Sequence, residues 1–257
     1  MLTVGGTAEG VPLWLFAGTS ERGTNGKLQA MNMDSRASQS LVGHIGGVYC
    51  LAQSGSYLFS GGDDTLVHTW QFGAAGQLEP VTKLAGHTQP VQDMKIVGEQ
   101  LITADRGGTV AIWGLSGETA GQAQLTINTG HERALMALWV EDPYLFTCAL
   151  DGKVKVWAAD GSNVYEHTVT NKDNQPSAIT ALTVVQSADR AESSVMVTAC
   201  EDSALKLWCM PTFDRRGIIA SRAGHTNTPR CLAKGPGRSF FSGGMDHSII
   251  VWEFQLA

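Results

Sequence analysis

The chain of 257 residues lacks the features of membrane and secreted proteins. No apolar run approaches the ~20 residues that a membrane-spanning helix needs, and the first residues do not form the basic-then-apolar pattern of a secretory signal. The five cysteines are an odd number, and most of them lie in strand-like segments. We therefore expect reduced thiols rather than a disulfide framework, and a location in the cytoplasm or nucleus.

Basic residues and helical patterns are also scarce. The 18 Lys and Arg residues against 24 Asp and Glu residues give a net charge of −6. Nucleic-acid binding requires a positive surface, so we do not expect nucleic acid as a partner of these residues. No helical period persists, whereas alternating segments such as residues 65–70 and the 30 glycines indicate strands joined by tight turns.

What the sequence does contain is a repeat built on four residue types. A Gly-His pair precedes a tryptophan by 26 or 27 residues four times: His44 and Trp70, His87 and Trp113, His131 and Trp157, His225 and Trp252. An aspartate lies six residues before a tryptophan at Asp64, Asp151, Asp202 and Asp246. A hydroxyl residue lies four residues before each aspartate, at Ser60, Thr147, Thr198 and Ser242. A self-similar unit of about 40–45 residues with this signature is typical of a β-propeller blade.

The repeat resembles the WD40-repeat family, and this resemblance implies an all-β WD40-type propeller. In that family the turn aspartate meets the histidine, the histidine meets the hydroxyl, and the hydroxyl meets the indole N–H. The resemblance implies this chain of contacts for three complete sets: His44, Ser60, Asp64, Trp70; His131, Thr147, Asp151, Trp157; His225, Ser242, Asp246, Trp252. The same residue types form catalytic triads, but nucleophilic catalysis needs one triad and not three copies at fixed spacing. We expect no catalytic residues, no enzyme activity and no cofactor.

Six repeats are recognisable within one expected domain of residues 1–257, at about 1–40, 41–84, 85–128, 129–174, 175–222 and 223–257. The first is degenerate, because no tryptophan lies in its usual place. In the third, Gly107 stands where the other repeats have aspartate, so His87 must find another partner; Asp105 could substitute, although it lies two positions earlier. The last repeat stops after its third strand pattern. We expect a ring that is incomplete on the N-terminal side, with self-association through an open blade edge.

Three linker segments, residues 157–163, 210–217 and 235–243, are similar to plant CCCH zinc-finger proteins that end in a WD-repeat propeller. The zinc-finger spacing C-x8-C-x5-C-x3-H does not occur in the chain. Cys200 and Cys209 have eight residues between them, but Arg215 stands where the third cysteine would be. The RNA binding that the finger implies therefore does not transfer to these residues. His68 and His247 lack a second histidine or a carboxylate at a ligand spacing, so we expect no metal site.

We interpret the chain as a non-catalytic scaffold for protein or peptide partners. One alternative is a substrate receptor of a ubiquitin ligase, which usually carries a Trp-Asp-x-Arg motif. The residues after the tryptophans argue against it, since they are Gln71, Gly114, Ala158, Cys209 and Glu253. The other alternative is the propeller part of an RNA-associated CCCH zinc-finger protein.

The binding surface can be predicted from blade geometry. In a four-stranded antiparallel meander, the loop before the first strand and the turn after the second lie at the same end. Side chains five residues after each histidine and one before each aspartate position therefore come together, and strand alignment adds two from the fifth repeat. The set is Tyr49, Asp63, Gln92, Arg106, Met136, Leu150, Thr180, Glu201, Arg230 and Met245. We expect Tyr49, Arg106, Met136 and Arg230 to be the anchors, because Tyr, Met and Arg are enriched at interfaces, and WD-repeat proteins often bind peptides at this face.

Overall fold

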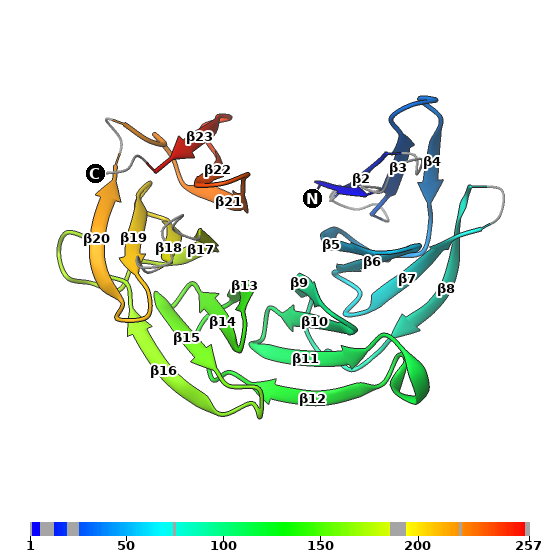
Figure 1. Cartoon of the computed structure of the whole chain (residues 1–257), viewed down its shortest axis with the longest axis horizontal. Coiled ribbons are helices and arrows are strands. Elements are labelled where there is room, and N and C mark those ends of the chain that lie inside the picture. The colour runs from blue at the N-terminus through cyan, green and yellow to red at the C-terminus, as the bar shows by residue number, and fades with distance from the viewer. Residues whose placement is uncertain are drawn as a thin grey trace. The chain divides into compact units, whose positions relative to one another are not determined.

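A computed structural model describes residues 2–5, 13–19, 26–73, 76–185, 194–220 and 223–254. The chain divides into two compact units, Met1–Thr129 and Gly130–Ala257. Each unit contains three antiparallel β-sheets, and each sheet is formed by strands that follow one another in the chain (Figure 1). We number the sheets 1 to 6 in chain order.

The first unit contains sheets 1, 2 and 3, each with four strands. Sheet 1 consists of β1 (Leu2–Gly5), β2 (Trp14–Gly18), β3 (Leu28–Asn32) and β4 (Ser38–Leu41). Sheet 2 consists of β5 (Val48–Ser54), β6 (Tyr57–Gly62), β7 (Val67–Phe72) and β8 (Leu78–Leu84). Sheet 3 consists of β9 (Val91–Val97), β10 (Gln100–Asp105), β11 (Thr109–Gly114) and β12 (Ala123–Asn128). The first repeat, although degenerate in sequence, thus forms a full sheet.

The second unit contains sheets 4, 5 and 6. Sheet 4 consists of β13 (Leu135–Glu141), β14 (Tyr144–Ala149), β15 (Lys153–Trp157) and β16 (Asn163–Thr168). Sheet 5 consists of β17 (Ile179–Val185), β18 (Val195–Cys200), β19 (Leu205–Cys209) and β20 (Asp214–Ile219). Sheet 6 has three strands among the described residues: β21 (Pro229–Lys234), β22 (Ser239–Gly244) and β23 (Ile249–Glu253). The expectation of three strands in the last repeat agrees with this topology.

The core of each unit lies between neighbouring sheets. One cluster joins sheets 1 and 2 through Phe16, Leu28 and Trp70, and another joins sheets 5 and 6 through Val197, Leu205 and Phe240. The strand β17 is covered on both faces, and every one of its residues is buried. Burying one large apolar side chain in this way stabilises the fold by about 1.5–3 kcal/mol.

The all-β prediction is confirmed for the described part of the chain, where the only helical element is the short 3-10 turn at Gly117–Thr119. Within those residues no helix has both the length and the apolar character to cross a membrane. All five cysteines are free, as expected. Burial raises the pKa of the Cys200 thiol to about 11, which keeps it protonated and inert at neutral pH.

Candidate functional site

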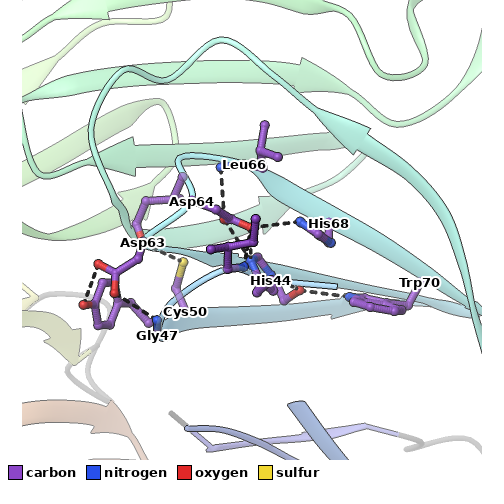
Figure 2. A network of polar contacts seen from close by, with 12 residues as sticks. His44, Gly47, Cys50, Asp63, Asp64, Leu66, His68 and Trp70 are labelled. Atoms are coloured by element: carbon purple, nitrogen blue, oxygen red, sulfur yellow. Dashed lines mark hydrogen bonds and ion pairs between the residues drawn. The ribbon is translucent and has the colours of Figure 1, made fainter. Parts of the chain in front are cut away.

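The predicted contact chain is complete in sheet 2 (Figure 2). His44 Nδ1 lies 2.9 Å from Asp64 Oδ1, and His44 Nε2 lies 2.8 Å from Ser60 Oγ. The indole N–H of Trp70 donates to the same Ser60 oxygen at 2.9 Å. The histidine comes from the loop before β5, the hydroxyl from β6, the aspartate from the following turn and the tryptophan from β7. One contact chain therefore ties two strands and two connections together.

Sheets 4 and 6 repeat this arrangement. His131 lies 2.9 Å from Asp151 and 3.0 Å from Thr147, which accepts from Trp157 at 3.0 Å. In sheet 6 the contacts join His225 to Asp246 at 3.0 Å, His225 to Ser242 at 2.7 Å, and Trp252 to Ser242 at 2.7 Å. The hydroxyls are buried and already hydrogen-bonded, so these sets are structural and cannot present a nucleophile to a substrate.

Sheet 3 contains a fourth complete set, which the sequence interpretation left open. His87 Nδ1 lies 3.1 Å from Asp105 Oδ2, so Asp105 does replace the missing turn aspartate. His87 Nε2 lies 2.7 Å from Thr103, and Trp113 donates to Thr103 at 2.8 Å. The spacing of four residues between hydroxyl and aspartate does not identify Thr103, because Asp105 lies two positions early. The spacing between hydroxyl and tryptophan does identify it, since the two are ten residues apart in sheets 2 to 6.

Sheet 5 keeps half of the set. Trp208 donates to Thr198 at 3.1 Å, but no histidine bridges this pair to Asp202. The Lys206 ammonium, which is 2% exposed, donates to Asp202 at 2.7 Å instead. A buried cation thus takes the place of the imidazole as the partner of the turn carboxylate.

The carboxylates of the complete sets are held in their charged form. Burial alone would raise the pKa of Asp64, but hydrogen bonds from His44 and His68 hold it well below its usual range. The pKa values of Asp105, Asp151 and Asp246 are lowered as well: burial opposes the shift, and hydrogen bonds from histidines, backbone N–H groups and, at Asp246, the Ser248 hydroxyl outweigh it. Each aspartate therefore serves as a charged acceptor at neutral pH.

His68 contradicts the expectation that it has no carboxylate or second histidine near it. Its Nε2 lies 3.1 Å from Asp64 Oδ2, and its ring centroid lies 3.9 Å from that of His44. The sequence hid this cluster because His68 lies on β7 and His44 in the loop before β5. Antiparallel pairing brings the two together over one carboxylate.

The predicted binding residues share a backbone feature. In sheets 2 to 6 a β-bulge leaves one residue of the first strand without a partner on the second. These bulge residues are Tyr49, Gln92, Met136, Thr180 and Arg230. The first residue after each second strand then donates its backbone N–H to the loop before the first strand, at 2.8–3.0 Å. These turn residues are Asp63, Arg106, Leu150, Glu201 and Met245. We refer to the ten residues as the bulge–turn set.

In the first unit the bulge–turn residues form a connected cluster. The Tyr49 hydroxyl donates to Asp63 at 2.7 Å, and the Arg106 guanidinium lies over the Tyr49 ring, 5.4 Å from its centroid. Arg106 also donates to Gln92 at 3.3 Å. Burial and the Asp63 carboxylate raise the pKa of Tyr49, so the phenol stays protonated as a donor.

In the second unit Glu201, Arg230 and Met245 are exposed, and Met136 and Leu150 are half-buried. The assignment of Thr180 to a binding surface is wrong. Thr180 is 4% exposed, and its hydroxyl donates to the carbonyl of Pro229 in sheet 6 at 2.5 Å. The short hydroxyl side chain at this bulge therefore hydrogen-bonds the neighbouring sheet.

Comparisons with known proteins agree with this geometry. The family model "WD domain, G-beta repeat" matches residues 35–71, 122–158 and 217–253. The solved WD40 β-propeller domain of Doa1 superposes with a TM-score of 0.72 at 17% identity, over 93% of this chain and 74% of that one. The chain is a WD40-repeat β-propeller. Its six sheets are the blades, so sheets 1 to 6 are blades 1 to 6 from here on.

The propeller is also similar to plant proteins named for CCCH zinc fingers, as the linker segments indicated. It is 30% identical over 244 residues to zinc finger CCCH domain-containing protein 17 of Oryza sativa subsp. japonica, covering 95% of this chain and 52% of the relative. It is 31% identical over 248 residues to protein 63 of that name in Arabidopsis thaliana, covering 94% and 52%. The chain spans about half the length of the curated relatives it matches.

Proposed function

We propose that this WD40 propeller binds an extended segment of a partner protein through its exposed bulge–turn residues, without catalysing a reaction. WD40 propellers are in general protein-interaction scaffolds. The observation that carries the proposal is the bulge repeated in blades 2 to 6, which places one residue outside the strand pairing beside one turn residue in each blade.

The chemistry of the set suits an extended peptide. Tyr49 and Arg106 are already held against each other before a partner arrives, so little side-chain entropy is lost on binding. Met245 and Met136 supply adaptable apolar surface, while Arg230 and Glu201 supply charges of both signs. A partner segment with alternating apolar and charged side chains fits this mixture.

The test is a pull-down from cells with the quadruple variant Tyr49→Ala, Arg106→Ala, Met136→Ala, Arg230→Ala. A matched control is Tyr57→Ala with Tyr144→Ala, because these exposed aromatics begin the second strands of blades 2 and 4, at the opposite end from the bulges. We expect the quadruple variant to lose partners that the control retains. If both folded variants recover every partner as the wild type does, the site lies elsewhere.

A second candidate function is the propeller part of an RNA-associated CCCH zinc-finger protein in the cytoplasm or nucleus. The likeness to CCCH relatives over 94–95% of this chain supports it. Here the propeller would bind a protein while RNA contacts come from sequence beyond these residues. Repeating the pull-down after RNase treatment tests this candidate, which expects part of the recovered partners to be lost with the RNA; if every partner persists, the RNA association is not supported.

A further inference from the structure

Blade 2 gathers two imidazoles and a carboxylate into one cluster (Figure 2). Asp64 lies 2.9 Å from His44 Nδ1 and 3.1 Å from His68 Nε2 through its two carboxylate oxygens. One potential ligand atom from each of the three side chains lies within 4.8 Å of the other two. The three residues come from a loop, a turn and a strand of one blade, all within the first unit.

The second histidine is not required by the blade architecture. The residue four positions after the aspartate is Lys155 in blade 4, Lys206 in blade 5 and Ile250 in blade 6. In blade 3 the aspartate lies two positions early, and the residue paired with the hydroxyl as His68 is paired with Ser60 is Ala111. Those blades pair the aspartate with at most one imidazole. The contact chain therefore forms without a second histidine, and His68 is an additional aspartate partner in blade 2.

We infer that His44, Asp64 and His68 form a binding site for a divalent transition-metal ion of the Zn²⁺ class. Two imidazole nitrogens and one carboxylate are the ligand types that this class prefers, and three protein ligands leave a fourth position for water. Tetrahedral bonds of 2.0–2.2 Å place ligand atoms about 3.3–3.6 Å apart. Asp64 Oδ2 lies 3.0 Å from His44 Nδ1 and 3.1 Å from His68 Nε2, so both contacts need to lengthen by only a few tenths of an ångström to admit the ion.

To bind the ion, each imidazole carries its proton on the nitrogen that faces away from Asp64. For His44 that nitrogen is Nε2, which can then donate to Ser60 at 2.8 Å. Such outer partners fix the orientation of ligating histidines. For His68 it is Nδ1, which faces Gly43, where even a Cβ would come within 3.0 Å.

The surroundings hold the carboxylate in place and leave it near solvent. The backbone N–H of Ile45 donates to Asp64 Oδ2 at 3.2 Å, and that of Leu66 to Oδ1 at 3.4 Å. The Asp64 side chain is 8% exposed, and Val42 and Ile45 on the covering loop are largely exposed. The cluster thus lies directly beneath an exposed surface loop.

The experiment uses the full chain treated with EDTA, in a Cys231→Ser background that removes the exposed thiol. Zn²⁺ affinity and stoichiometry are measured by competition with a chromogenic chelator, and Co²⁺ is added to read ligand geometry from its visible absorption. We expect one ion per chain, a tetrahedral Co²⁺ spectrum without thiolate bands, and a Zn²⁺-dependent rise in Tm.

The decisive variant is His68→Lys, which introduces the residue found at this position in blades 4 and 5. We expect its Zn²⁺ affinity to fall by about 100-fold or more, beyond the loss seen for outer partners alone. His247→Lys makes the same change at an exposed histidine outside the cluster and should bind as the parent does. The proposal is overturned if the parent takes up no Zn²⁺ at micromolar concentrations, or if His68→Lys binds as tightly as the parent.

Discussion

In blade 3 the carboxylate that pairs with the His87 imidazole comes from the end of a strand rather than from the following turn. Asp105 is the last residue of β10, directly after the position where the register with β9 shifts. The imidazole is buried, and a buried donor without a partner costs about 1–3 kcal/mol. Any nearby carboxylate that reaches Nδ1 is therefore favoured, whichever residue supplies it.

We predict that Asp105→Ala lowers the free energy of unfolding by about 1–3 kcal/mol, because it leaves the His87 nitrogen without an acceptor. Urea unfolding measures the loss. Arg106→Ala is the control, since Arg106 is the exposed next residue and its loss should cost no more than about 0.5 kcal/mol. Equal effects of the two substitutions would show that Asp105 does not stabilise blade 3.

At the scale of the single strand, the fourth strands of blades 1 to 5 share a sequence pattern with one exception. The residue opposite the first buried apolar residue of the third strand is apolar in four blades: Leu41, Leu84, Ile127 and Ile219. In β16 it is His167, opposite Val154. The ring packs edge-on against Trp208 at 4.4 Å, and its Nε2 is buried and has no hydrogen-bond partner among the described residues. Burial lowers the pKa of His167, because the charged form is poorly solvated there.

His167→Leu should therefore stabilise the protein by about 1 kcal/mol at neutral pH, since an unpaired polar atom is replaced by an apolar group. The gain should grow below pH 6.5. There the unfolded chain binds a proton that the folded His167 resists, so the wild type loses stability as the pH falls. Denaturant unfolding between pH 5 and 8 tests this. A variant with the same slope against pH as the wild type would contradict it.

Across the whole molecule, the spacing of His, Asp and Trp was enough to predict blades 2 to 6 and the contacts within three of them, whereas the degenerate first blade carries no such signature. The spacing could not predict that His68 lies beside His44 and Asp64, because antiparallel pairing decides which strand residue faces which loop residue. Nor could it show that Thr180 bonds the next blade, because a bulge leaves no mark on the hydrophobic pattern. The open ring and self-association stay predictions; β23, whose Ile249 is 80% exposed, has no outer strand among the described residues.

The lowered aspartate pKa values make acid sensitivity a property of the whole chain. Asp64, Asp105, Asp151 and Asp246 belong to four different blades. A carboxylate with a lowered folded pKa stabilises the protein above its unfolded pKa of about 3.9, and that stability is lost as the pH falls through the folded value. We expect the free energy of unfolding to fall steeply below about pH 4. Asp151→Asn should reduce that slope in acid titrations followed by circular dichroism. An unchanged slope would exclude the Asp151 contact chain as a source of the acid sensitivity.

The repeated bulge also bears on how such a protein can diversify. A residue at a bulge takes no part in strand pairing, so its replacement leaves the ladder intact. Positions 92, 136 and 230 are thus open to mutation at little thermodynamic cost, and position 49 at the cost of the Tyr49–Asp63 hydrogen bond, so new binding preferences can arise there one substitution at a time. Position 180 is the exception, since its hydroxyl joins two blades. A library that randomises the first four positions and keeps the fifth would explore recognition on an unchanged frame.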